Sequence, residues 1–234
     1  MELNGKNVLI TGASGGIGKA IADTFIKHGC KVILHYNSNP IQSDYFTVKA
    51  DISKKEEIKL MFNKIEEKYG HLDILINTVG IEETYEDQLD TNNWQKTFQV
   101  NLFGTVECVK YTLNMMQKGL IVNITSIMGN QGIVGLESLA YSISKAALQK
   151  FSENLSLMLA PNIRVVSISP GYTITPIWDM FSKEQKAEAI KSVPIKRFIK
   201  PEEVAKFITS VAENDAITGT NFTIAGGFNL KNII

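Results

Sequence analysis

Net charge is absent from this chain. Its 234 residues include 24 lysines and arginines against 24 aspartates and glutamates, and these cancel. A chain without net charge produces no overall field that would attract a nucleic acid or an anionic membrane. We therefore expect neither partner, and any charged ligand has to be held by a local group of side chains.

Cysteine and histidine are scarce. The two cysteines, Cys30 and Cys108, lie in apolar segments, which is typical of reduced thiols in the cytoplasm rather than of a disulfide. His28, His35 and His71 occur singly, without the spacing of metal ligands. The sequence therefore predicts no disulfide and no metal site.

Long hydrophobic runs and linkers are also missing. No apolar stretch approaches the roughly 18 residues that cross a bilayer, and the N-terminal "MELNGKNVLITG" passes directly into a strand-like segment. Repeats, low-complexity tracts and linkers rich in proline, glycine or serine do not occur. We expect a soluble, cytoplasmic protein that forms a single domain over residues 1–234.

What the sequence does contain is an alternation of short β-branched segments and longer helical periods. Continuous runs of valine, isoleucine and leucine are buried on both faces, as in a parallel sheet between two helical layers. The expected strands cover 7–11, 31–36, 45–48, 73–77, 120–125, 163–169 and 221–225, and the expected helices cover 16–28, 54–69, 91–117, 138–159, 182–191 and 201–212. The pattern predicts a doubly wound α/β fold with a parallel sheet of about seven strands.

One connection breaks this pattern. Between the second and third expected strands, "NSNPIQSD" at 37–44 is too short for a crossover helix and contains Pro40. We therefore expect a reduced crossover at this point.

A glycine-rich turn follows the first strand. In "NVLITGASGGIGKAIADTF", Gly12, Gly16 and Gly18 stand between an expected strand and an expected helix. Glycines there permit a tight turn and a close approach of the backbone to a pyrophosphate, and the helix N-terminus offers unpaired N–H groups. This context predicts a Rossmann-type dinucleotide site; the alternative is a turn whose glycines serve packing alone.

Two tyrosine–lysine pairs have the spacing of a proton-transfer pair. Tyr141 and Lys145 in "AYSISKAAL" share one face of an expected helix, with Cβ atoms about 5–6 Å apart, so the ammonium can stabilise a phenolate. Tyr45 and Lys49 lie in or beside a strand, where four residues span about 13 Å. We expect Tyr141 and Lys145 to be catalytic and the other pair to be a coincidence.

The glycine spacing, T-G-x-x-x-G-x-G, and the order of the polar residues resemble the short-chain dehydrogenase/reductase family along almost the whole chain. The resemblance implies hydride transfer between a nicotinamide cofactor and a carbonyl or secondary alcohol. It also implies that Asn101 holds a water and that Ser126 positions the substrate. In the same way it implies that Tyr141 acts as acid/base and that Lys145 bonds the nicotinamide ribose. Taken singly, Ser126 is equally a helix cap and Asn101 equally a bend residue. Ser126 and Tyr141 are fifteen residues apart, two more than in the family, so we expect a small insertion in "GNQGIVGLES".

The same resemblance implies a set of cofactor contacts. Asp51 matches the residue that contacts the adenine, and "NTVG" at 77–80 keeps Asn77 and Gly80 of the family's N-N-A-G while its middle pair differs. Further on, "PGYTIT" offers backbone groups and threonine hydroxyls to the nicotinamide carboxamide. The expected cofactor-binding residues are Gly12, Ser14, Gly16, Ile17, Gly18, Tyr36, Asn37, Ser38, Asp51, Ile52, Asn77, Gly80, Tyr141, Lys145, Pro170, Gly171, Thr173, Ile174 and Thr175.

Cofactor choice depends on the end of the second strand. A carboxylate there would select NAD(H) by bonding the ribose 2′-OH, but Tyr36 stands in its place. Asn37, Ser38 or a protonated His35 could contact a 2′-phosphate, although no arginine is present there. We expect NADP(H) to be favoured, with NAD(H) as the alternative.

The last third of the chain bears on the substrate. Residues 176–200 form the expected lid, whose basic rim is either a docking site for an acidic acyl carrier protein or an ordinary solvated face. That rim consists of Lys183, Lys186, Lys191, Lys196, Arg197 and Lys200. The C-terminal part resembles 3-oxoacyl-(acyl-carrier-protein) reductases, which implies a 3-oxoacyl thioester substrate, a role in fatty acid biosynthesis and a homotetramer paired through helices 91–117 and 138–160. The alternatives are another ketone, a sugar or a biosynthetic intermediate, and a non-catalytic nucleotide-binding regulator.

Overall fold

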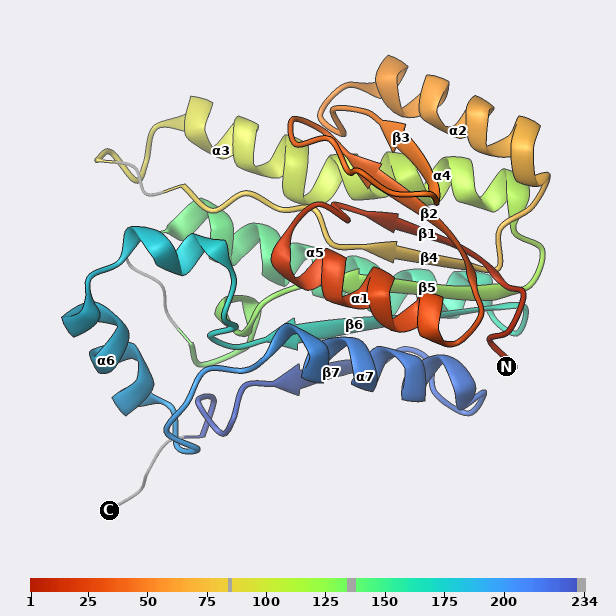
Figure 1. The fold of residues 1–234 in the computed structure, drawn as a ribbon. Helices are drawn as coiled ribbons and strands as arrows, with labels where there is room; N and C mark the ends of the chain where they lie inside the picture. The colour runs from red at the N-terminus through yellow and green to blue at the C-terminus, as the bar shows by residue number, and fades with distance from the viewer. Residues whose placement is uncertain (84–85, 134–137, 231–234) are drawn as a thin grey trace.

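Seven parallel strands form one sheet through the middle of the molecule (Figure 1). The computed structural model describes residues 1–83, 86–133 and 138–230. The strands are β1 (Asn7–Thr11), β2 (Lys31–Tyr36), β3 (Phe46–Lys49), β4 (Ile74–Asn77), β5 (Gly119–Ile124), β6 (Ile163–Pro170) and β7 (Asn221–Ile224). Their order is β3-β2-β1-β4-β5-β6-β7, and every adjacent pair is parallel, which confirms the doubly wound α/β fold.

Helices cover both faces of this sheet (Figure 1). On one face, α1 (Gly16–Lys27) and α7 (Pro201–Glu213) pack on the strands and on each other. The other face is covered by α2 (Lys55–Tyr69), α4 (Thr105–Met115) and α5 (Leu139–Leu159). The described α-helices also include α3 (Thr91–Phe98) and α6 (Lys183–Ser192), both on the side toward which the strands point.

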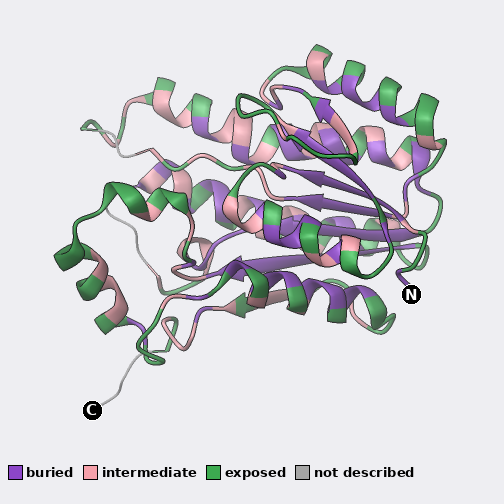
Figure 2. Ribbon diagram, in the orientation of Figure 1, coloured by how far each residue is buried: buried purple, intermediate pink, exposed green. Residues whose placement is uncertain are grey.

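The strands are buried because their consecutive side chains enter opposite cores. In β1, Leu9 packs with the layer of α2, α4 and α5, whereas Val8 and Ile10 pack with α1 and α7. All 5 residues of β1 and all 6 of β5 are buried, and Figure 2 shows the sheet as the buried centre of the molecule. The continuous apolar runs in the sequence therefore report burial on both faces.

The connection between β2 and β3 contains no helix, as expected. The chain passes from Tyr36 to Phe46 through mostly exposed residues, and Ile41 packs against the core beside α1. Asn37 and Ser38 are consequently exposed at the end of β2.

The long helix expected over 91–117 is interrupted. Between α3 and α4, the six residues of η1 (Gln99–Gly104) form a π-helix, and η1 contains Asn101. Gly104 passes so close to the chain after β3 that a Cβ would lie 2.6 Å from the carbonyl oxygen of Ile52. A π-helical turn shifts the register of the side chains that follow, and such turns are frequent at functional sites.

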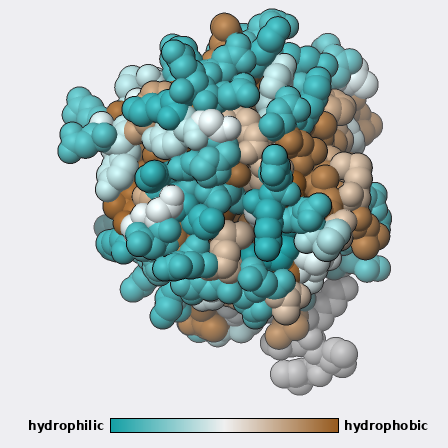
Figure 3. Space-filling model, turned by 90° about the vertical axis from the view of Figure 1, so that its right-hand side faces the viewer, coloured by the Kyte–Doolittle hydropathy of each residue, from teal (hydrophilic) through white to brown (hydrophobic). Residues whose placement is uncertain are grey.

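The end of the molecule at which the strands begin is mostly covered by hydrophilic side chains (Figure 3). Among the residues that the structure describes, no helix is long and apolar enough to cross a membrane. The polar residues that the sequence singled out lie at the other end, where the strands finish.

Candidate functional site

The residues expected to carry the chemistry converge at the carboxyl ends of the strands, on the left in Figure 1. The glycine turn joins β1 to α1, Ser126 follows β5, and Tyr141 and Lys145 belong to α5. From β1 the strand order runs to β2 and β3 on one side and to β4 and β5 on the other, so the winding direction reverses between β1 and β4. In doubly wound sheets, ligands bind at the strand ends beside such a reversal.

The glycine turn is shaped as a cradle. Gly12 has a φ of +68°, and a Cβ at this position would lie 2.7 Å from Thr78 Oγ1. A Cβ on Gly16 would lie 2.7 Å from Thr175 Cγ2, and a Cβ on Gly18 would overlap the carbonyl oxygen of Gly12. Close contacts with β4 and with the segment after β6 therefore leave room for glycine alone.

The N-terminus of α1 opens into this cradle without a side-chain cap. Gly15 occupies the capping position, and no side chain bonds the first N–H groups of the helix. Unpaired N–H groups and the positive end of the helix dipole suit a phosphate. Ser14 is exposed beside them, and Ile17 packs against the core. The residues present thus fit the pyrophosphate of a nicotinamide dinucleotide.

The altered "NTVG" segment ties β4 to its neighbours. Thr78 Oγ1 donates to the Thr11 carbonyl oxygen at 2.5 Å, and Thr11 Oγ1 accepts from the Thr78 N–H at 3.1 Å. Asn77 is buried, and its Nδ2 donates to Asn123 Oδ1 at 2.9 Å. The Asn77 side chain therefore links β4 to β5 beneath the site, and its contact with the cofactor stays a prediction.

Asp51 is held by its neighbours at the end of β3. Its Oδ1 accepts from the Ser53 N–H at 2.9 Å and from Ser53 Oγ at 2.7 Å, and Lys54 Nζ lies 3.6 Å from its Oδ2. Partial burial acts to raise the pKa of Asp51, but the Ser53 hydrogen bonds and the Lys54 ammonium outweigh it, so the pKa is lowered. Ile52 is buried against Gly104. The contacts of Asp51 and Ile52 with the adenine stay predictions.

His35 does not face a phosphate. Its side chain is buried, with Nδ1 3.0 Å from the backbone nitrogen of Gly12 and Nε2 2.9 Å from the carbonyl oxygen of Ala50. Burial lowers the pKa of His35. The prediction that a protonated His35 contacts a 2′-phosphate is therefore wrong, whereas Asn37 and Ser38 are exposed and their role stays a prediction.

The segment after β6 reaches back to the glycine cradle. Thr173 is buried, and its Oγ1 donates to the Gly171 carbonyl oxygen at 2.9 Å. Thr175 lies against Gly16, and Ile174 between the two threonines is exposed. Of the two threonines expected to bond a nicotinamide carboxamide, Thr175 is the one that borders the cradle.

Lys145 is a buried cation in the site. Its Nζ donates to the Ile124 carbonyl oxygen at 3.0 Å and lies 5.8 Å from the centroid of the Tyr141 ring. Burial lowers the pKa of Lys145 to about 8, and the Glu82 carboxylate acts in the opposite direction. A Cβ on Gly80 would lie 2.9 Å from the ammonium nitrogen, so a glycine at this position leaves room for it.

Asn101 is fully buried and fixes the loop after β4. Its Oδ1 accepts from the Ile81 N–H at 2.8 Å, and its Nδ2 donates to the Ile81 carbonyl oxygen at 2.9 Å and to Ser144 Oγ at 3.0 Å. These bonds hold the loop against α5 next to Lys145. The water that Asn101 is expected to hold stays a prediction.

Ser126 and Tyr141 lie close together in the site, where the Ser126 hydroxyl acts to lower the pKa of Tyr141. Ser126 Oγ also accepts from the Met128 N–H at 3.1 Å and thereby caps the 3₁₀ turn η2 (Ile127–Gly129). The two roles proposed for this serine, helix cap and catalytic partner, are thus compatible. The expected insertion before Tyr141 falls partly on 134–137, which lie outside the described residues.

The pKa of Tyr141 is raised rather than lowered. Burial is the largest cause, the Glu82 carboxylate adds to it, and the Ser126 hydroxyl opposes it. The expectation that Lys145 lowers this pKa is therefore wrong for this structure. Tyr141 is therefore protonated near neutral pH and can act as a proton donor.

The sequence reasoning missed Glu82. Ser138 Oγ donates to Glu82 Oε1 at 3.4 Å, and the carboxylate acts electrostatically on Tyr141, Lys145 and Tyr172. Desolvation by neighbouring groups raises the pKa of Glu82, although the residue is exposed. No motif marks this residue; its place five positions after the end of β4 is the signal that could have found it.

A polar network behind Ser126 was also missed. Gln149 Nε2 donates to Asn130 Oδ1 at 2.7 Å, to Ser169 Oγ at 3.0 Å and to the Ser126 carbonyl oxygen at 3.3 Å. Asn130 Nδ2 in turn donates to Thr223 Oγ1 at 3.0 Å. The network joins α5, β6 and β7 to the turn that carries Ser126, and Gln149 lies one helical turn beyond Lys145.

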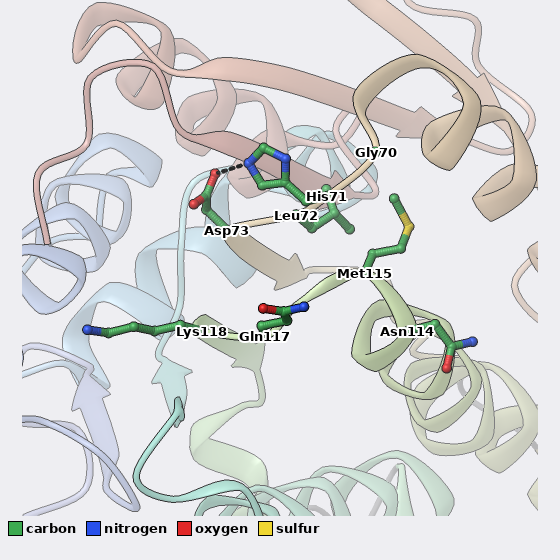
Figure 4. Close-up of a pocket in the computed structure, with 8 residues that line it drawn as sticks. All are labelled: Gly70, His71, Leu72, Asp73, Asn114, Met115, Gln117 and Lys118. Carbon is green, nitrogen blue, oxygen red and sulfur yellow. Dashed lines mark ion pairs between the residues drawn. The ribbon is translucent and has the colours of Figure 1, made fainter.

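A separate hollow of about 360 Å³ lies at the other end of the sheet, between the ends of α2 and α4 (Figure 4). His71 points toward Asp73 in this view, with Nε2 3.5 Å from Oδ2, and Lys6 Nζ lies 2.9 Å from Asp73 Oδ1. The hollow lies where β4 begins, away from the glycine cradle, and its Asp73 is already held by Lys6 and His71. In the described part of the chain, no group of three or more His, Cys, Asp or Glu side chains could hold a metal ion.

Known proteins match this chain over nearly its whole length. A family model described as enoyl-(acyl carrier protein) reductase matches residues 12–229. Glucose 1-dehydrogenase 2 of Bacillus subtilis is 34% identical, over 98% of this chain and 96% of that protein. The 3-oxoacyl-[acyl-carrier-protein] reductase FabG of Thermotoga maritima is 32% identical, over 97% of this chain and 99% of that protein. Among solved structures, the RhlG/NADP active-site complex of Pseudomonas aeruginosa has a TM-score of 0.91 at 26% identity and covers 98% of both chains.

The solved structure has the same fold as this chain, and the family model covers the chain from the glycine cradle to the residues just after β7. Oxidoreductases with different named substrates match equally well, so they share a reaction type rather than a substrate. A family match over residues 12–229 and two relatives that are 34% and 32% identical show that this chain belongs to the short-chain dehydrogenase/reductase family of NAD(P)-dependent oxidoreductases.

Proposed function

We propose that the chain transfers hydride between NADP(H) and a small hydroxylated carbonyl compound, such as a sugar, or the corresponding alcohol. The observation that carries this proposal is the placement of Ser126 and Tyr141 together beside the buried Lys145, with the Glu82 carboxylate close enough to act on Tyr141 and Lys145. When bound, the nicotinamide provides the hydride chemistry. The residues of the chain orient the substrate oxygen and move its proton.

Tyr141 holds the proton for the substrate oxygen. Because its pKa is raised, its hydroxyl is protonated near neutral pH and can donate to a carbonyl that is being reduced. Ser126 Oγ orients the same oxygen, and the Lys145 ammonium lowers the cost of the phenolate that remains. In the reverse direction Tyr141 has to lose its proton first, so alcohol oxidation is favoured at higher pH.

Glu82 supports a hydroxylated substrate. A carboxylate beside Tyr141 can accept hydrogen bonds from several donors, and Ser138 supplies one at 3.4 Å. Hydroxyl groups next to the reacting carbon would supply more. Tyr172 brings a phenol hydroxyl within the field of Glu82, and its ring is held edge-on by Trp178 at 5.4 Å between centroids. The relative named glucose 1-dehydrogenase 2 is consistent with this choice.

A 3-oxoacyl thioester is the second candidate substrate. The segment after β6 exposes an apolar strip that would suit an acyl chain, formed by Ile174, Ile177, Met180 and Phe181. The relative named FabG is consistent with it and with a role in fatty acid biosynthesis. Such an enzyme would receive its substrate on an acyl carrier protein.

The basic rim that would dock this carrier is partly neutralised. Lys191 pairs with Glu188 at 3.4 Å, and Arg197 pairs with Glu203 at 2.7 Å. The rim therefore offers less positive charge than its sequence indicates, which makes the carrier-bound substrate the weaker of the two proposals.

Lys49 supports the preference for NADP(H). In the register of β2 and β3 it stands opposite Tyr36, and it is exposed. The neighbouring Val48 is buried in the core on the α2 side, so Lys49 points to the opposite face of the sheet, the same as Tyr36. Lys49 would therefore provide a positive charge near Asn37 and Ser38, where the sequence contains no arginine.

Association into a homotetramer is supported by exposed apolar residues on the α4–α5 side. Phe103 in η1 and Ile143 in α5 are 49% and 45% exposed, and Leu157 and Met158 at the end of α5 are 82% and 67% exposed. Large apolar side chains in such positions suit burial against another copy of the chain. We place the protein in the cytoplasm, where its two buried cysteines would stay reduced.

Replacement of the proton donor tests the reaction class. We expect Tyr141→Phe to lower kcat by about 100- to 10,000-fold, because the general acid is lost while the ring is kept. The rate of NADPH oxidation with a turned-over carbonyl compound measures this. Tyr45→Phe, which alters the chance pair, should leave kcat unchanged. A wild-type kcat in Tyr141→Phe would refute the acid role.

The substrate class is tested with a panel of aldoses, polyols, simple ketones and acetoacetyl thioesters. We expect Glu82→Gln to lower kcat/KM for a hydroxylated substrate about tenfold, because bonds from substrate hydroxyls to a charged acceptor are weakened. Simple ketones should change little. Since Glu82 raises the pKa of Tyr141, the variant should also shift the rise of alcohol oxidation to lower pH.

The matched control for this substitution is Glu86→Gln, on an exposed residue of the same loop. Turnover of thioesters without turnover of any sugar or polyol would replace the first candidate substrate by the second. If the protein turns over neither class, both candidate substrates are refuted. The Tyr141 substitution then tests the reaction type on other ketones.

Cofactor preference is tested by binding. We expect Lys49→Gln to raise the dissociation constant of NADPH about tenfold and to leave that of NADH unchanged, because only NADPH carries the 2′-phosphate. Fluorescence titration of the protein with each cofactor measures this. Lys31→Gln, at the start of β2, is the control. Equal affinity of wild type for both cofactors would contradict the preference.

The homotetramer is tested by light scattering on the purified protein. Wild type should show the mass of four chains, and Ile143→Asp should give a smaller species because a charge is placed in the apolar contact. A monomeric wild type would refute the assembly.

A further inference from the structure

His35 joins three segments around the glycine cradle. Its Nδ1 accepts from the Gly12 N–H at 3.0 Å, its Nε2 donates to the Ala50 carbonyl oxygen at 2.9 Å, and its own carbonyl oxygen accepts from the Ala13 N–H at 2.9 Å. The regular pairing of β1 with β2 ends at Ile10. The His35 bonds therefore continue the link between these strands into the turn, where it would otherwise be lost.

The partners of the ring fix its protonation state. The Gly12 N–H can only donate, so Nδ1 has to offer a lone pair, and the Ala50 carbonyl oxygen can only accept, so Nε2 has to carry the proton. The ring is therefore neutral, in the Nε2–H form. A second proton on Nδ1 would face the Gly12 N–H and break the bond to the cradle.

We infer that His35 is a positioning residue for the dinucleotide, which holds the first glycine of the cradle in its left-handed conformation so that the turn is ready for a pyrophosphate. This inference rests on the proposed cofactor site. Gly12 has a φ of +68°, and its N–H is the group that an unanchored turn would leave unpaired inside the protein. His35 touches neither the catalytic residues nor the exposed surface that faces the ribose.

The charged groups near His35 do not favour a second proton strongly enough to offset its burial. Burial lowers the pKa of the ring, while the bond to Ala50 and the charge of Asp51 act to raise it. Asp51 is itself neutralised in part by Lys54 at 3.6 Å. Affinity for the cofactor should accordingly be constant near neutral pH and fall as the pH drops into the range where the ring is forced to take a second proton.

Cofactor binding by substituted proteins tests the role. We expect His35→Phe, which keeps an aromatic ring but offers no acceptor to Gly12, to raise the dissociation constant of NADPH about tenfold. The value of kcat at saturating cofactor should stay close to that of wild type, because Tyr141 and Lys145 are not touched. His35→Asn offers both an acceptor and a donor and should recover most of the affinity, without the loss at low pH.

The matched control is His28→Phe, on an exposed histidine at the end of α1, which should bind NADPH as wild type does. Unchanged affinity in a folded His35→Phe protein would overturn the role of His35. If wild type binds neither NADPH nor NADH, the proposed function fails instead, which separates the two outcomes.

A second measurement does not depend on any variant being folded. Nitrogen-15 NMR of wild type without cofactor should show one protonated and one unprotonated ring nitrogen for His35, unchanged through neutral pH. A ring that exchanges freely between its two neutral forms, or that carries two protons at neutral pH, would overturn the inference. A single Nε2–H form that persists until the acidic loss of cofactor affinity would support it.

Discussion

The reversal of winding direction between β1 and β4 is the constraint on which the rest of this structure depends. All seven strands run the same way, so their carboxyl ends meet at one edge, and the order β3-β2-β1-β4-β5-β6-β7 places the point of reversal at that edge. Helices cover both faces of the sheet with apolar cores, so polar side chains gather at the ends of the strands. The glycine cradle, the loop with Glu82 and the turn with Ser126 all occupy that edge.

At the ends of the strands, a few neighbouring ionisable groups influence one another's protonation. Burial of Lys145 lowers its pKa to about 8, and its ammonium is held by a carbonyl oxygen. The Glu82 carboxylate acts to raise the pKa of both Lys145 and Tyr141. It therefore favours the charged form of the lysine and the neutral form of the tyrosine.

Much of the fold could be predicted from the sequence, because each strand is a continuous apolar run and each crossover has a helical period. The missing helix between β2 and β3 was equally visible, since Pro40 and a short segment leave no room for one. The π-helix at Gln99–Gly104 was not, because residues 91–117 contain no proline that would mark a change in the helix. It becomes visible only when Asn101 is seen to bond Ile81 across the site.

The candidate site, like the fold, contains some residues that the sequence predicts and others that it does not. Residues with a fixed spacing or a required glycine, such as Tyr141 with Lys145 and the cradle, are predicted from the sequence, and the structure places them at the same end of the sheet. Residues that matter through tertiary contacts were not. Glu82 follows no motif, and His35 was assigned a surface role because its burial under the turn cannot be read from neighbouring letters. The cofactor contacts of Asn77 and Asp51 rest on the family resemblance and stay predictions.

The bare connection between β2 and β3 has an evolutionary consequence. Residues 37–44 border the end of β2 yet contribute little beyond Ile41 to the core. With the ribose bound as proposed, substitutions, insertions or a grafted loop at this point would change how it is recognised while leaving folding stability nearly intact. The proposed cofactor preference could then drift or be engineered independently of the residues of α5.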